Sequence, residues 1–302
     1  MDPLVFALVA GAAVLHVAWN VLLKTAGDPF RAATIGMSAA AAVIVPAAAF
    51  GWVAIGRPPI PAEAIVLAAG SAVLEAAYFA FLAAAYRRGD LSVVYPIARG
   101  TAPLLAVAVG IVVLEERLGP PGIAGVAALL VGLLALQRPW RFLPAFRGRG
   151  SRGGDAAVAF ALATGVTIAA YSAVDRVGTR LVEPWLYAGL MWAFLAPFLW
   201  AGVAIGGRHR AHRAPVLGDQ LLDVRRAAIG GWLTLAAYLL ILAAFSVAPL
   251  TAVAPLRESA IVLASGWGTL RLGEGGNRGE AIRRIAASAV VVAGAVLLAL
   301  DG

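Results

Sequence analysis

Long apolar stretches, separated by short polar breaks, follow one another along the whole chain. Each is rich in Ala, Leu and Val, and a helix needs about 20 such residues to cross the hydrocarbon core of a bilayer. None alternates polar and apolar residues as the strands of a membrane barrel do. We therefore predict ten transmembrane helices, at residues 4–24, 32–54, 62–86, 91–114, 121–137, 156–176, 184–206, 226–247, 250–270 and 281–300.

Composition agrees with a multi-pass membrane protein whose main partner is the lipid bilayer. Of the 302 residues, 62% are hydrophobic and 13% are charged, whereas about a quarter of a soluble domain is charged. The first apolar stretch lacks a basic segment before it and a clear cleavage site, so we interpret it as a retained span. The expected location is the cell (inner) membrane.

The two halves of the chain resemble each other. FALVAG at 6–11 matches FALATG at 160–165, and EAAYFAFLAA at 75–84 matches LAAYLLILAA at 235–244. Farther along, Pro96 falls on Pro255 and Glu115 on Glu274. Because each half holds five spans, an odd number, the second half would enter the membrane inverted, as in many secondary transporters. We expect one five-helix repeat at 1–137, a basic Gly/Arg-rich linker at 138–155 and a second repeat at 156–302.

Several motifs resemble the drug/metabolite transporter superfamily, EamA-like type. They are AWNVLLK at 18–24, GDLSVVYPI at 89–97 and LEERLG at 114–119. The second half departs from the pattern, because Arg257-Glu258 stands where the first half has Ala98-Arg99. The resemblance implies ten helices in two inverted halves and a transport activity. Its members export amino acids and other metabolites, exchange nucleotide-sugars or sugar phosphates, or expel toxic cations, so it does not select the substrate.

Other classes of function find little support in the sequence. There is no cysteine, two of the three histidines lie in an arginine-rich loop, and no phosphate-binding loop or hydrolytic set of residues is spaced correctly. We therefore expect no enzyme activity, no cofactor and no metal. The net charge of +8 comes from short loops between spans, a pattern typical of membrane orientation, so we expect no nucleic-acid partner. The expected assembly is a monomer or a weak homodimer.

Ionisable residues within a transmembrane helix are costly, and they are retained where they are paired or line water. Arg99 follows Pro96 in the fourth span and could bind a substrate carboxylate or phosphate, to which a guanidinium is geometrically suited. It could instead form a buried ion pair with Glu75 or Glu258. Glu75 has a leucine, Leu235, at its position in the second half, so its carboxylate is expected to balance charge or carry a proton.

Further candidates lie at mid-span or near span ends. His16 and Asn20 share a helix face; the histidine could relay protons or serve only in packing. Asn20, Tyr78, Tyr238 and Trp267 are expected to line the path of the substrate. Glu258 is a possible counter-ion, and Glu115 and Glu274 are expected to act as gates or caps.

The leading hypothesis is a secondary transporter that exports amino acids or similar small zwitterions by alternating access, with protons as a candidate coupling ion. The alternatives are an organic-cation exporter, with Glu75 and Glu258 as ligands, and a lipid-handling, flippase-like protein. Most of the 24 Lys and Arg residues fall in the loops after the odd-numbered spans, which favours a cytoplasmic location for those loops and both termini outside. The family resemblance implies the opposite orientation.

Overall fold

The computed structural model describes residues 2–24, 28–88, 91–138, 152–210, 224–258 and 278–301, and this part of the chain is helical, with no strand. The expected all-α class is thus confirmed for these residues. The ten helices are α1 (Pro3–Lys24), α2 (Pro29–Ala54), α3 (Ala62–Tyr86), α4 (Leu91–Val112), α5 (Pro120–Gln137), α7 (Arg152–Gly178), α8 (Pro184–Arg210), α9 (Val224–Val247), α10 (Leu250–Glu258) and α12 (Arg278–Ala299).

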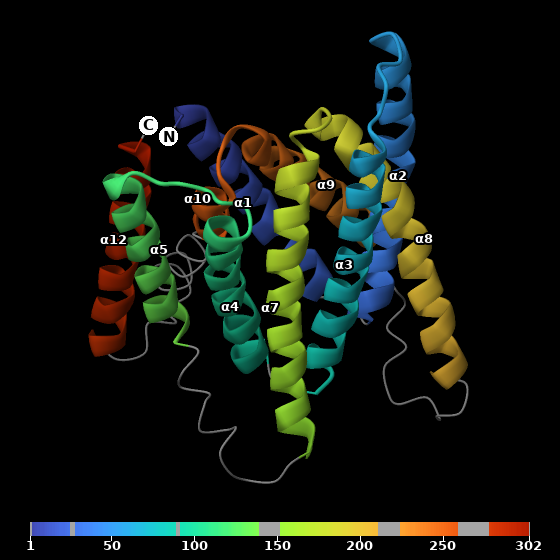
Figure 1. The fold of residues 1–302 in the computed structure, drawn as a ribbon. Helices are drawn as coiled ribbons and strands as arrows, with labels where there is room; N and C mark the ends of the chain where they lie inside the picture. The colour runs from blue at the N-terminus through green and yellow to red at the C-terminus, as the bar shows by residue number, and fades with distance from the viewer. Residues whose placement is uncertain are drawn as a thin grey trace.

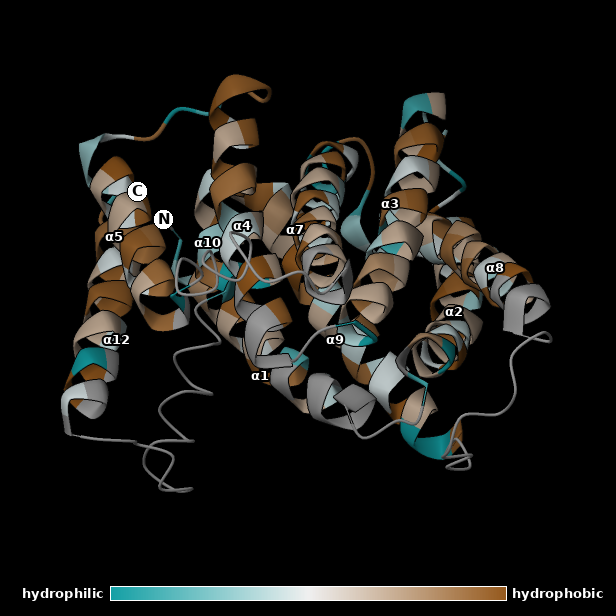
Figure 2. Ribbon diagram, turned by 90° about the horizontal axis from the view of Figure 1, so that it is seen from below, coloured by the Kyte–Doolittle hydropathy of each residue, from teal (hydrophilic) through white to brown (hydrophobic). Residues whose placement is uncertain are grey.

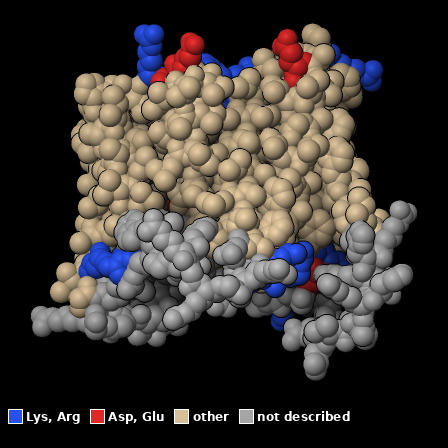
Figure 3. All heavy atoms as spheres, turned by 60° about the horizontal axis from the view of Figure 1, so that its bottom comes forward, with Lys and Arg blue, Asp and Glu red and all other residues tan. Residues whose placement is uncertain are grey.

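Five of these helices, α2, α3, α7, α8 and α9, are long and apolar enough to cross a membrane. Shorter apolar stretches occur in α1, α4, α5 and α12. In Figure 3 an uncharged belt crosses the visible face of the molecule, with charged side chains above and below it, and in Figure 2 the helices are coloured mainly as hydrophobic. These features suggest a membrane-embedded protein. Of the expected ninth span, only the part in α10 belongs to the described residues.

The helices run back and forth between the same two ends of the molecule, and both termini lie at one end (Figure 1). Helix α5 packs along α12 at the edge, α3 along α7, α1 along α9, and α2 along α8. Helix α4 contacts both α7 and α10. Each of these pairs joins the segment before residue 138 to the segment after it, so the two segments form one interleaved bundle.

Glycines allow two of these helix pairs to approach closely. A Cβ atom on Gly294 of α12 would lie 2.7 Å from the carbonyl oxygen of Gly125 in α5, and a Cβ on Gly125 would lie 2.8 Å from that of Gly294. Gly36 and Gly231 face each other in the same way between α2 and α9. Small residues at such contacts let backbones pack without side chains between them, as in membrane helix bundles.

Local sequence explains where α2 begins. The Asp28 carboxylate accepts hydrogen bonds from the backbone N–H groups of Phe30 (3.1 Å) and Arg31 (3.2 Å), and Pro29 occupies the first turn of α2. Such a side chain replaces intrahelical partners that the first turn lacks. Helix α7 begins at Arg152, inside the segment 138–155 that was expected to be a linker.

Candidate functional site

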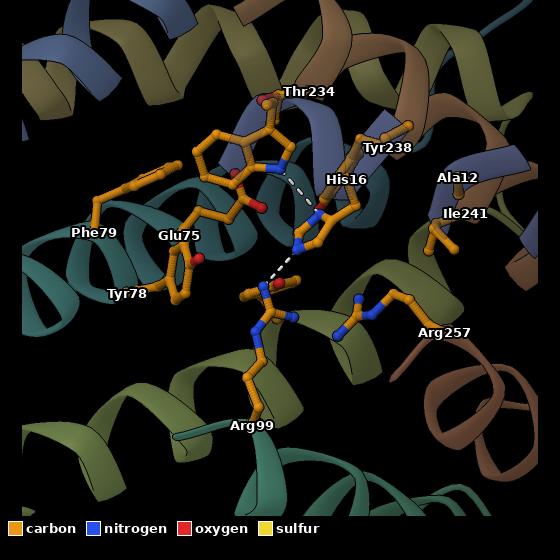
Figure 4. A pocket seen from close by; sticks show the side chains of 13 residues that line it. Ala12, His16, Glu75, Tyr78, Phe79, Arg99, Thr234, Tyr238, Ile241 and Arg257 are labelled. Atoms are coloured by element: carbon orange, nitrogen blue, oxygen red, sulfur yellow. Dashed lines mark hydrogen bonds between the residues drawn. The ribbon is translucent and has the colours of Figure 1, made fainter. Parts of the chain in front are cut away.

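A cavity of about 50 Å³ lies inside the bundle, among α1, α3, α4, α7, α9 and α10. Both halves of the chain therefore contribute to its wall. Figure 4 shows the guanidinium of Arg257 and the carboxylate of Glu75 on opposite sides of the His16 ring, with Arg99 reaching in from below. The polar residues of the lining are His16, Glu75, Tyr78, Arg99, Tyr171, Thr234, Tyr238 and Arg257.

Arg99 is buried and forms an ion pair with Glu258. Its Nη1 lies 3.0 Å from Oε1 and 3.3 Å from Oε2 of that carboxylate. Its Nη2 contacts Nε2 of His16. Of the two counter-ions considered from the sequence, Glu258 rather than Glu75 is thus the one within ion-pair distance in the structure.

His16 lies between Arg99 and Trp19. The indole Nε1 of Trp19 donates to Nδ1 of His16 at 3.0 Å, and the two rings meet edge to face with centroids 5.5 Å apart. A neutral imidazole has one acceptor nitrogen, and both Arg99 and Trp19 can only donate. The ring can therefore accept a hydrogen bond from one of these two donors at a time.

Arg257 is adjacent in sequence to Glu258 and shares its carboxylate with Arg99. Its Nε is 3.4 Å from Oε1 of Glu258, and its Nη1 donates a long hydrogen bond, 3.4 Å, to Oγ of Ser172. The Nε is buried and has no hydrogen-bond partner among the described residues. Two guanidinium groups therefore face one carboxylate at this end of the cavity.

An acidic side chain occupies the opposite end. Glu75, on α3, is 6% exposed and lines the cavity. Tyr238, on α9, also belongs to the cavity wall. The cavity is thus polarised, with cationic groups on α4 and α10 and a carboxyl group on α3.

A third buried carboxylate, Asp175 of α7, contacts Tyr238 and is not among the site residues predicted from the sequence. It is 1% exposed. Ser71 donates to its Oδ1 at 2.5 Å, Tyr187 donates to the same oxygen at 3.1 Å, and Tyr238 donates to Oδ2. Helices α3, α7, α8 and α9 are joined by these bonds. Its sequence signal is an aspartate inside an apolar run, although it lies near the end of the predicted span 156–176 and not at mid-span.

The tyrosines of the cavity wall form a connected series of rings. Tyr78 and Tyr171 have centroids 6.2 Å apart, Tyr171 and Tyr238 6.4 Å, and Tyr238 meets Trp192 at 5.1 Å. Tyr78 and Tyr238, two of the residues predicted to line a substrate path, both lie in the cavity wall. Trp267 and Glu274 lie outside the described residues, as does the side chain of Asn20.

The capping contact near the end of α4 is made by Glu116 and not by its neighbour Glu115. Glu116 accepts hydrogen bonds from the backbone N–H groups of Leu250 (2.7 Å) and Thr251 (2.9 Å) at the start of α10. It also lies 3.3 Å from Nε of Arg176. Glu115 is exposed and has a left-handed backbone conformation, with φ of 53°, which turns the chain so that the next residue faces α10.

Comparisons with known proteins bear on the fold. No protein-family model matches the sequence, and no curated protein matches it. Among solved structures, one described only as "Crystal structure of protein" is similar over 99% of this chain and 98% of its own, with a TM-score of 0.67 and 20% sequence identity. At that identity the likeness extends to the fold alone. The fold of the chain therefore has a counterpart among solved structures.

Proposed function

We propose that this protein is a secondary transporter of small polar metabolites, of the EamA-like drug/metabolite type, that works by alternating access. Amino acids or related zwitterions are the leading substrates, and export is the leading direction. The observation that carries the proposal is the polarised cavity: it is buried in the bundle, formed by both halves, and lined by guanidinium groups on one side and a carboxyl group on the other. Charged groups at such depth are typical of substrate and ion pathways.

Helix packing supports an arrangement of ten spans in two inverted repeats. If the two halves are exchanged, α1 takes the place of α7, α3 that of α9, α4 that of α10, and α2 that of α8. The contacting pairs α1–α9, α4–α7 and α2–α9 then become α7–α3, α10–α1 and α8–α3, and these pairs are also in contact. Helices α5 and α12, and likewise α2 and α8, would be equivalent to each other and also pack together. Substrate sites of inverted-repeat transporters lie at the interface of the repeats.

The cavity is small for a metabolite site. Ligand sites commonly measure about 300–1,000 Å³, so a cavity of about 50 Å³ would enclose only a charged head group or a very small metabolite. Alternating access would enlarge the site when one end opens. Glu75 would balance charge or carry a proton during this cycle, and no covalent chemistry is proposed at the site.

An organic-cation exporter is the second candidate, because Glu75 and Tyr238 could receive a cation at the acidic end. A lipid-handling protein is the third, although a central cavity favours a metabolite over a lipid. Uptake into proteoliposomes of a panel of labelled amino acids, organic cations and phosphates separates these functions. We expect saturable uptake of one or more amino acids, whereas uptake of cations alone, or of nothing in the panel, would contradict the proposal.

A further inference from the structure

The two arginines of the cavity differ in how many of their donors are already used. Arg99 directs Nη1 to both oxygens of Glu258 and Nη2 to His16. Arg257 makes one long hydrogen bond, to Ser172, and its Nε has no hydrogen-bond partner in the described part of the chain. A guanidinium group carries five N–H donors, so Arg257 has donors available for another acceptor.

Among the described residues, positive charge is in excess at this end of the cavity. Arg99 and Arg257 contribute two positive charges, and the ion pairs of both are with Glu258, at 3.0 Å and 3.4 Å. The acid that lines the cavity, Glu75, lies on the other side of the His16 ring (Figure 4). A buried guanidinium without a full complement of acceptors is costly, and a single negative charge placed beside Arg257 would remove that cost.

We propose that Arg257, and not Arg99, is the ligand for the anionic group of the substrate, and that this group is a single carboxylate. Arg99 instead holds α4 against α10 through Glu258. The carboxylate of a small zwitterion would receive two parallel hydrogen bonds from Arg257, and its ammonium group would point across the cavity toward Glu75 and Tyr238. This inference rests on the proposed transport function and specifies how the substrate is oriented.

The test measures binding to the purified full-length protein in lipid nanodiscs, by equilibrium dialysis with labelled L-alanine. Unlabelled propionate and ethylamine serve as competitors, because each retains one of the two charged groups of alanine. We expect propionate to compete and Arg257→Gln to weaken L-alanine binding by about 10- to 100-fold, the range for loss of a charge-assisted pair. Arg225→Gln, which removes the same charge from an exposed position, should bind L-alanine like the wild type.

If Arg257→Gln does not fold, Arg257→Lys keeps the charge and removes the two-pronged geometry, and we expect it to weaken binding about tenfold. Wild-type affinity for L-alanine in either folded variant would overturn the inference. Competition by ethylamine but not by propionate would overturn it as well. Neither result would contradict the proposed transport of amino acids. If wild-type protein binds no probe and transports no compound of the panel, the proposed function itself fails.

Discussion

Arg99 and Glu258 form an ion pair inside the bundle, with Nη1 3.0 Å from Oε1, although they lie 159 residues apart in the chain. The alignment that places Pro96 on Pro255 also places Arg99 on Glu258. A contact between two residues at equivalent positions of a repeat is expected where the axis relating the halves passes through the structure. The pair thus supports the proposed repeat and would lie near its axis.

Removal of Glu258 should destabilise the protein more than removal of Arg99. Glu258→Gln leaves two buried guanidinium groups without their carboxylate, and loss of one partner of a buried pair costs about 3–5 kcal/mol. Arg99→Gln leaves Glu258 with Arg257, 3.4 Å away, and should cost less. Thermal unfolding of both variants in the same detergent provides the comparison. An equal or larger loss for Arg99→Gln would show that Glu258 does not serve both arginines.

Asp175 is expected to stabilise the packing of α3, α8 and α9 around α7. Asp175→Asn removes the charge that receives hydrogen bonds from Ser71, Tyr187 and Tyr238. Hydrogen bonds to charged groups contribute about 1.5–3 kcal/mol each, so the unfolding free energy should fall by at least about 2 kcal/mol. Asp2→Asn is a matched control, because Asp2 is exposed. Its carboxylate accepts a hydrogen bond from the Leu4 N–H at the start of α1, and asparagine caps a helix equally well. Equal stability of the two variants would argue against this role.

Two adjacent glutamates should behave differently at the end of α4. Glu116→Ala removes the acceptor of two backbone N–H groups of α10 and the partner of Arg176, and we expect a loss of about 1–3 kcal/mol. Glu115→Ala, at an exposed position, should change stability by less than about 0.5 kcal/mol. Chemical unfolding in mixed micelles measures both. The reverse order would mean that Glu115 is the cap, as first expected from the sequence.

Membrane orientation can be tested by cysteine labelling, because the chain has no cysteine of its own. The distribution of Lys and Arg predicts that Ser151, in the basic segment, faces the cytoplasm and that Pro59, in the connection between α2 and α3, faces outward. An impermeant thiol reagent applied to intact cells should label Pro59→Cys, and should label Ser151→Cys only after lysis. The opposite result would agree with the orientation implied by the family resemblance.

Much of the architecture could be predicted from the length of the apolar stretches, because a helix that crosses a bilayer needs about 20 consecutive apolar residues. The polar residues His16, Glu75, Arg99, Tyr78 and Tyr238 also stand out, since each interrupts an apolar run, and the structure places all of them in the cavity wall. The cost of polar groups in an apolar medium explains why such interruptions point to a site.

Other features depend on tertiary packing, which the sequence signals only weakly. Asp175 lies near the end of a predicted span, yet helices α3, α8 and α9 bury it through hydroxyl groups that have ordinary sequence contexts. Glu115 and Glu116 are indistinguishable by type, and only the left-handed backbone at Glu115 decides which of them reaches α10. The different engagement of Arg99 and Arg257 likewise depends on how α4 and α10 meet.

The central claim, that a buried polar cavity carries out transport, is tested most directly at Glu75. Glu75→Gln and Glu63→Gln make the same chemical change on the same helix, the first in the cavity wall and the second at an exposed position. Initial rates of labelled amino-acid uptake should be compared in proteoliposomes that contain equal amounts of folded protein. We predict that Glu75→Gln abolishes or strongly slows uptake while Glu63→Gln retains the wild-type rate; wild-type uptake by Glu75→Gln at every pH tested would contradict the account.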